Sequence, residues 1–249
     1  MALNFGRRSV AQSLDQAQID QGLRSYMLQV YNYMTTGLAI TGFVSYFFAK
    51  LCFIFENNGQ VRLTALGDAI YGSFIQWIII LAPLGFVFYL ASRINKISVS
   101  SALITFFAFS AVMGLSLAYI FAIYTGASIV RVFFISSGVF LSMSIYGYTT
   151  KKDLTGFGSF LIMGLFGIII ASIVNIFMQS SMLYFGISCI GVLIFVGLTA
   201  YDTQKIKNMY LESDVEEVSS KKALMGALSL YLDFINLFIM LLRLFGQRR

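Results

Sequence analysis

Residues 223–246 read ALMGALSLYLDFINLFIMLLRLFG, and this stretch decides the fold of the chain. Between Lys222 and Arg243 lie 20 residues without a basic side chain. At about 1.5 Å per residue, a helix of this length crosses the roughly 30 Å hydrocarbon core of a bilayer. Its one acid, Asp233, lies at the middle, where an ionised carboxylate costs about 2.5 to 3.5 kcal/mol or more. We therefore expect Asp233 to have a partner or a function.

Helical spacing divides this stretch into two faces. Ser229, Asp233 and Asn236 fall at i, i+4 and i+7, whereas Leu230 and Phe234 lie on another face. We expect the polar face to lie against protein or water and the apolar face against neighbouring helices or lipid. Ser229 and Asn236 are thus candidate pore-lining residues.

The composition is that of a polytopic membrane protein. Of 249 residues, 58% are hydrophobic and 11% charged, against about 25% charged in soluble domains. The net charge of +6 does not indicate nucleic acid, because the basic residues lie between apolar runs rather than in one patch. Cys52 and Cys189 both fall in apolar runs, where buried free thiols are expected. The chain has no histidine, so any acid-base chemistry falls to carboxylates.

Uncharged runs predict six further membrane spans upstream, which makes seven in total. They are 31–53, 71–92 (with Pro83 as a packing kink), 100–123, 128–148, 157–178 and 182–201. Residues 1–24 are predicted to be a polar cytoplasmic segment, residues 25–249 a transmembrane domain, and residues 56–68 a polar loop. The fold class is therefore an all-α membrane protein, a seven-helix bundle.

The distribution of Lys and Arg predicts the orientation. With the N-terminus inside, eleven basic residues would be cytoplasmic: Arg7, Arg8, Arg24, Arg93, Lys96, Lys151, Lys152, Lys205, Lys207, Lys221 and Lys222. Six would be outside: Lys50, Arg62, Arg131, Arg243, Arg248 and Arg249. This bias favours a cytoplasmic N-terminus and an external C-terminus, although the basic C-terminus runs against it.

A second acid, Asp202, ends the sixth span in GLTAYDTQKIK, residues 197–207. The sixth and seventh spans are consecutive and antiparallel, so both carboxylates approach from the same side. For the two carboxylates to come into contact, the sixth helix must continue past Asp202. At about 4 Å and an effective dielectric near 20, two charges repel by roughly 4 kcal/mol, so the pair would share one proton near neutral pH. Arg93 is the candidate counter-charge, and Lys96 is the alternative.

Structural roles compete with this interpretation. Asp202 could simply cap a helix at the membrane interface, and Asp233 could hydrogen-bond a neighbouring polar side chain to hold helices together. Interfacial charges are common, so this alternative weighs more for Asp202 than for Asp233, which lies deeper.

At these residues the chain resembles the Bax inhibitor-1 family. The motifs that carry the resemblance are GLTAYDTQKIK at 197–207 and MGALSLYLDFINLFIMLLRLFG at 225–246, preceded by six spans, in the pattern of a bacterial member. The resemblance implies a seven-helix fold in which the C-terminal helix is central. It also implies that Asp202 and Asp233 are the family's aspartate pair and that Arg93 corresponds to its gating arginine.

The resemblance and the residues together predict a pH-sensitive calcium leak channel in the bacterial inner membrane, gated by protonation of the aspartate pair. Protons and permeant Ca²⁺ would be its ligands, and Asp202 with Asp233 would form only a weak Ca²⁺ site, because Ca²⁺ takes six to eight oxygens. No tightly bound cofactor is expected. A regulator that binds a membrane protease is the alternative, since another bacterial branch of the family has that association.

An enzyme is not expected. Tyr201-Asp202 matches the first motif of intramembrane aspartyl proteases, but Asp233 follows Tyr231-Leu232 rather than the Gly-x-Gly of those enzymes. The chain also lacks a phosphate-binding glycine loop, a Cys or His metal cluster and a nucleophile-base pair.

Overall fold

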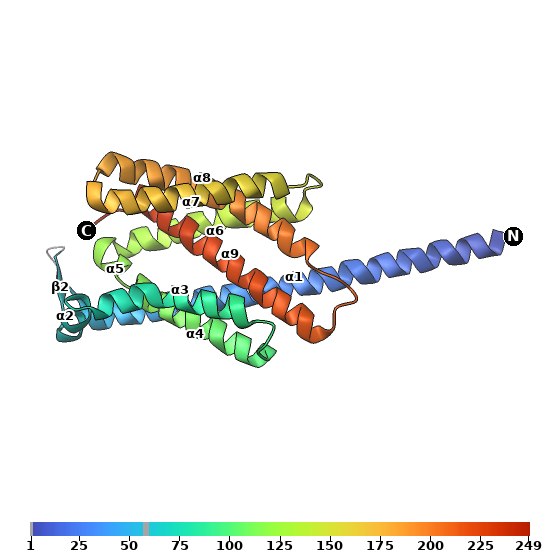
Figure 1. Ribbon diagram of the computed structural model, residues 1–249, viewed down its shortest axis with the longest axis horizontal. Coiled ribbons are helices and arrows are strands. Elements are labelled where there is room, and N and C mark those ends of the chain that lie inside the picture. Colours follow the sequence, from blue (N-terminus) through green and yellow to red (C-terminus); the bar gives the residue numbers. More distant parts are fainter. Residues whose placement is uncertain (1, 57–59) are drawn as a thin grey trace.

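The computed structural model describes residues 2–56 and 60–249, with side chains from residue 20 onward. In this part of the chain seven helices are long and apolar enough to cross a membrane, which confirms the predicted fold class (Figure 1). They are α1 (Ala2–Cys52, of which Asp20–Cys52 is the candidate span), α3 (Ile75–Arg93), α4 (Val99–Leu117) continued by α5 (Ile120–Ile123), α6 (Gly126–Thr149), α7 (Thr155–Met178), α8 (Ser181–Asn208) and α9 (Glu216–Phe245).

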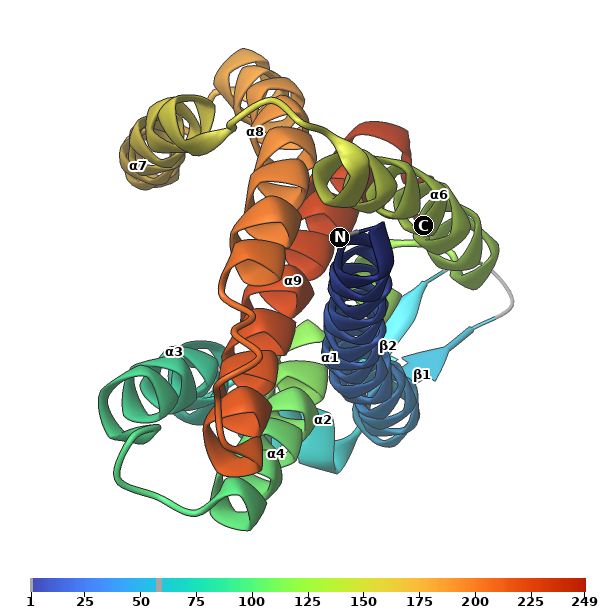
Figure 2. The same cartoon turned by 90° about the vertical axis from the view of Figure 1, so that its right-hand side faces the viewer.

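The last helix, α9, is the centre of the bundle. It packs against α8, α1, α6 and α4, and 72% of its most apolar window is buried, against 11% for α3 and for α7. Figure 2 shows α9 running between the other helices, with α3 and α7 at the outside. A small residue permits one of these contacts, because Gly226 lies against the side chain of Ile206 on α8. The expectation of a central C-terminal helix is confirmed.

A buried hydroxyl cluster fixes α9 to α1 and α4. The Tyr231 hydroxyl lies 2.6 Å from Thr41 Oγ1, and Thr41 donates to the carbonyl oxygen of Ser110 at 2.8 Å. The Tyr231 ring is fully buried and packs edge-on against Phe106 and Phe109. Because a hydroxyl in an apolar interior needs a partner, this cluster sets both the depth and the rotation of α9.

Regular structure extends into the predicted polar loop at residues 56–68 from both sides. Strands β1 (Phe53–Phe55) and β2 (Val61–Leu63) pair antiparallel, and α2 (Ala65–Tyr71) follows. Thr64 caps α2 by accepting a hydrogen bond from the Gly67 backbone at 3.0 Å. The second membrane helix consequently begins at Ile75, four residues later than predicted, because residues up to Tyr71 belong to α2.

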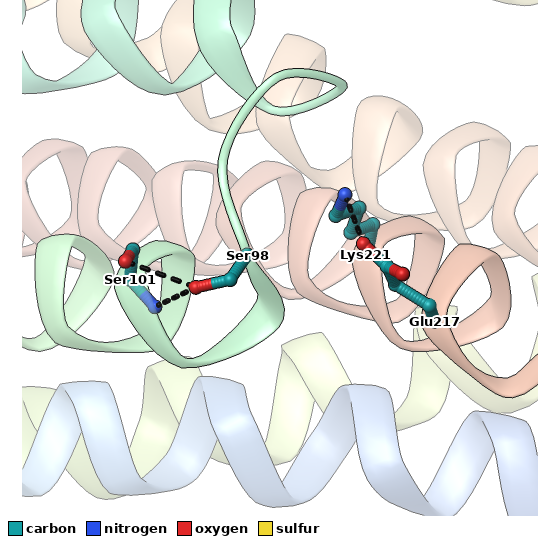
Figure 3. Close-up of polar contacts among 4 residues, drawn as sticks. All are labelled: Ser98, Ser101, Glu217 and Lys221. Atoms are coloured by element: carbon teal, nitrogen blue, oxygen red, sulfur yellow. Dashed lines mark hydrogen bonds and ion pairs between the residues drawn. The ribbon is translucent and has the colours of Figure 1, made fainter.

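The helices α4 and α9 begin at the end of the bundle from which α1 projects with the N-terminus (Figure 1), which we call the N-terminal end, and Figure 3 shows polar contacts in their first turns. Ser98 caps α4 by accepting a hydrogen bond from the Ser101 backbone at 3.2 Å. In the first turns of α9, Lys221 pairs with Glu217 at 2.7 Å. These contacts satisfy polar groups where the two helices begin.

Candidate functional site

The helix α8 continues beyond Asp202 to Asn208, as a meeting of the two carboxylates requires. Gln204 fixes this extension to the loop between α6 and α7. Its Oε1 accepts from the Leu154 backbone at 2.8 Å, and its Nε2 donates to the Lys152 carbonyl oxygen at 2.8 Å. The last turns of α8 are thus held by tertiary hydrogen bonds, although the sequence there is polar.

Lys222 fixes the turn between α8 and α9. Its ammonium group donates to Asp214 at 2.6 Å and to the carbonyl oxygen of Met209 at 3.1 Å. The side chains of both residues are largely removed from solvent. This contact ties the start of α9 to the end of α8 and so fixes the relative positions of the two helices that carry the acids.

The structure brings Asp202 and Asp233 together. Their carboxyl groups lie close enough to interact directly, although they are on different helices. Asp233 is 6% exposed, and its Oδ2 is buried without a hydrogen-bond partner, whereas Asp202 is partly exposed. Two carboxyl groups in contact cannot both carry a full charge at low cost, so the arrangement can hold one proton between them.

Both carboxyl groups line a cavity of about 630 Å³ between α7, α8 and α9. The predicted residues Ser229 and Asn236 line the same cavity, which places one complete polar face of α9 along it. Half of the remaining lining residues come from α7 and are mainly aliphatic, and Leu84 is contributed by α3. Asn236 donates its amide hydrogen to the Leu232 carbonyl oxygen at 2.8 Å, within its own helix.

Arg93 and Lys96, the predicted counter-charges, are exposed and do not line this cavity. Arg93 is the last residue of α3, at the N-terminal end of the bundle. The cation that does line the cavity is Lys205, and its charge acts on Asp202. Sequence reasoning missed Lys205, yet its position three residues after Asp202 puts the two on one helix face and could have indicated it.

The donor set can attract a cation but does not enclose one. Two carboxyl groups, three hydroxyl-bearing residues, one amide and the Lys205 ammonium group line the cavity, and nowhere in the described chain do three His, Cys, Asp or Glu residues form a metal-binding group. Because Ca²⁺ prefers six to eight oxygen ligands, water would have to complete any coordination here. The chemistry available is proton sharing and weak attraction of a cation.

Comparison with known proteins agrees with the fold. The family model for the inhibitor of apoptosis-promoting Bax1 matches residues 23–249. This chain is a member of the Bax inhibitor-1 family. The match includes both aspartates and all seven spans, so the family resemblance seen in the two sequence motifs extends over the whole membrane domain.

Bacterial relatives within the Bax inhibitor-1 family match over almost their full length. The chain is 46% identical to the inner membrane protein YbhL of Escherichia coli over 92% of its own length and 94% of that protein. It is also 46% identical to the uncharacterized protein RP147 of Rickettsia prowazekii, with 92% of each covered, and 36% identical to an uncharacterized membrane protein of Streptococcus pyogenes. This chain is accordingly a multi-pass integral membrane protein.

Proposed function

We propose that this protein is a pH-sensitive leak pathway for cations, with Ca²⁺ as the permeant ion, gated by protonation of Asp202 and Asp233. One observation carries the proposal: the two carboxyl groups interact directly and line a cavity within the membrane-spanning part of the bundle. By analogy with the Escherichia coli relative, we place the protein in a bacterial inner membrane.

The gate follows from electrostatics. With one shared proton, the pair forms a hydrogen bond between α8 and α9 and carries a single charge. Loss of that proton leaves two like charges, which at about 4 Å and an effective dielectric near 20 repel by roughly 4 kcal/mol. Such a change in energy is sufficient to shift an equilibrium between two packings of α8 against α9. The ionised pair also attracts a divalent cation into the cavity.

Lys205 limits how strongly the ionised aspartate pair attracts a cation. Its ammonium group lines the cavity and lies 5.9 Å from the centre of the Tyr201 ring. A cation that approaches the ionised pair must compete with this fixed positive charge, so the site holds an ion only briefly. Weak binding is what conduction requires, because an ion must be able to leave.

The test is Ca²⁺ flux into liposomes that contain the purified protein and a calcium dye, measured from pH 5 to pH 8. We expect flux that changes with pH for the native chain and pH-independent flux for Asp202→Asn and Asp233→Asn, because neither variant retains two titrating carboxyl groups in contact. The matched control is Asp68→Asn, which removes an exposed acid outside the cavity and should keep the native pH profile.

Two results would count against the gate. A native pH profile in Asp233→Asn would show that the pH response has another origin. Equal flux in protein-free liposomes and in liposomes with the native chain would remove the leak pathway itself. Thermal unfolding of each variant in detergent separates these outcomes from a failure to fold.

A further inference from the structure

A second cavity, of about 780 Å³, lies at the N-terminal end of the bundle and is separate from the aspartate pair. It is formed by α1, by the turn between α8 and α9, and by the first turns of α9. Aromatic and acidic side chains line it together: Tyr26, Tyr33, Tyr210, Glu212, Asp214 and Glu216. Its volume falls within the range of small-molecule binding sites and exceeds what a single ion needs.

Tyr26 provides an independent sign of a ligand. Its side chain is 3% exposed and lines the cavity, yet its hydroxyl has no hydrogen-bond partner. Its ring lies 5.6 Å from the ring of Tyr210. Gly22 leaves room for the Tyr210 hydroxyl, because a Cβ at this position would collide with it. A buried hydroxyl without a partner costs free energy, which a bound polar group would recover.

The charges in this cavity are not balanced. Asp214 pairs with Lys222 at 2.6 Å, and the neighbouring Lys221 pairs with Glu217 instead. Glu212 and Glu216 form no ion pair within the described part of the chain. The cavity therefore presents at least two carboxylates that lack a cation from the protein.

The walls of the cavity are fixed before any ligand binds. Gln29 on α1 donates to the Tyr33 hydroxyl at 2.8 Å and to Ser220 of α9 at 3.4 Å. Lys222 holds the turn through the carbonyl oxygen of Met209. Because these contacts tie α1, α9 and the turn together, binding would lose little free energy to the ordering of the site.

The geometry points to a binding site for a small organic polycation of the polyamine class. Ammonium groups are recognised by carboxylates together with aromatic faces and a phenol oxygen that accepts a hydrogen bond, and all three are present here. Two unpaired carboxylates call for at least two positive charges. A metal ion fits less well, since no three-acid group occurs among the described residues.

The test is equilibrium binding of radiolabelled spermidine to the purified full-length protein in detergent at low ionic strength, where screening is weak. We expect saturable binding that is weakened about five- to thirtyfold in the double variant Glu212→Gln with Glu216→Gln, from two partly screened charge pairs. Tyr26→Phe removes only the hydroxyl and should weaken binding about two- to tenfold. Glu217→Gln, a neighbouring acid outside the cavity, should bind like the native chain.

Three outcomes would overturn the site. These are the absence of saturable spermidine binding, an equal loss in Glu217→Gln, and displacement of spermidine by Ca²⁺ at lower concentration than by spermine. The unfolding temperature of each variant shows whether it is folded. If the double variant does not fold, the milder Tyr26→Phe still tests the site. Asp233→Asn should bind spermidine normally, so this site and the proposed gate can fail separately.

Discussion

At the scale of single residues, Tyr231 and Asp233 have opposite environments although they are two positions apart on α9. The Tyr231 hydroxyl is paired with Thr41, whereas Oδ2 of Asp233 is buried without a partner. Two residues along a helix correspond to about 200° of rotation, so the two side chains face opposite sides. The contact with Thr41 on one side therefore fixes the rotation that turns Asp233, on the other side, toward the cavity that Asp202 also lines.

Tyr231→Phe should lower the free energy of unfolding by about 1 kcal/mol, because it removes one buried hydrogen bond and leaves the ring packing intact. Thr41 keeps its bonds to the carbonyl oxygens of Gly37 and Ser110, which limits the loss. The measurement is unfolding in mixed detergent micelles. Tyr146→Phe is the control, since that ring is 44% exposed. An equal loss of free energy of unfolding in both variants would show that the hydrogen bond between Tyr231 and Thr41 does not stabilise the fold.

Asp153 gives a pH dependence outside the membrane. The Thr155 backbone donates to its carboxylate at 2.9 Å at the start of α7, and hydrogen bonds from Thr155 lower the pKa of Asp153 from its ordinary value of 3.8. A carboxyl group with a lowered pKa stabilises the fold above its unfolded pKa, and the stabilisation is lost as pH falls through the folded pKa.

Asp153→Asn should therefore lower the unfolding temperature slightly at pH 7, by no more than about 2 °C. The difference from the native chain should shrink as the pH falls below about 4. Thermal unfolding at pH 3, 5 and 7 checks this expectation. A difference that stays constant over this range would mean that the carboxylate charge does not contribute.

The site residues differ in how visible they are in the sequence. Asp202 and Asp233 stand out because each is an acid at or within an apolar run. Thr41 and Gln204 gave no such signal, since isolated polar residues are common in membrane helices and only the tertiary structure assigns their partners. Arg93 was predicted from its position at the end of the second span and from the family resemblance, and a contact that depends on how α3 is placed cannot be obtained from composition or spacing.

At the scale of elements, the membrane helices could be predicted because charge is excluded from the hydrocarbon core. The predicted and observed ends of the fifth span agree at Met178, and the fourth differs by one or two residues. Apart from the polar extension of α1, which is helical from Ala2 although the first span was predicted from residue 31, the largest differences are at α2, at the β1–β2 hairpin, at the end of α8 and at the start of α9. These depend on short-range caps and tertiary hydrogen bonds, which hydropathy does not report.

The contact between α6 and α8 supplies a prediction at this scale. A Cβ at Gly147 would collide with the backbone of Ala200, two residues before Asp202. Gly147→Ala should force the helices apart and cost about 1 to 3 kcal/mol of stability. Because α8 carries Asp202, the pH profile of Ca²⁺ flux should shift as well.

Gly138→Ala is the matched control on the same helix. A Cβ at Gly138 meets no atom within 4 Å, so this variant should be neutral or more stable by up to about 1 kcal/mol. Unfolding and flux measured for both variants give the comparison. The close approach of α6 and α8 would be without consequence if Gly147→Ala behaved like Gly138→Ala.

At the scale of the whole molecule, the helices differ in what surrounds them. The central α9 is buried among its neighbours, whereas α3 packs mainly on α4, and α7 mainly on α8, with their outer faces apolar. Figure 2 shows α3 and α7 apart from each other on the same flank of the bundle, where both contribute to the wall of the aspartate cavity. Movement of either peripheral helix would therefore change access to the pair without disturbing the buried contacts of α9.

Seven spans place the two termini at opposite ends of the bundle, as Figure 1 shows. At the far end, the C-terminal tail is held by backbone contacts: the Thr125 amide donates to the Gln247 carbonyl oxygen at 3.0 Å, and the Arg249 amide to that of Ile123 at 3.0 Å. These contacts keep the basic residues Arg248 and Arg249 at the end of the bundle where α9 finishes. The basic tail is thereby prevented from folding back toward the N-terminal end.

We therefore predict a cytoplasmic N-terminus and an external C-terminus, since eleven of the 17 Lys and Arg residues lie in the segments on the N-terminal side. Alkaline phosphatase, which is active only outside the cytoplasm, should be active when fused after Arg249 and inactive when fused in the loop at Lys151. A green fluorescent protein fusion should give the reverse pattern. Phosphatase activity at Lys151 would invert the orientation, and the aspartate pair would then respond to external rather than cytoplasmic pH, because Asp202 and the Lys151 loop lie toward the same end of α8.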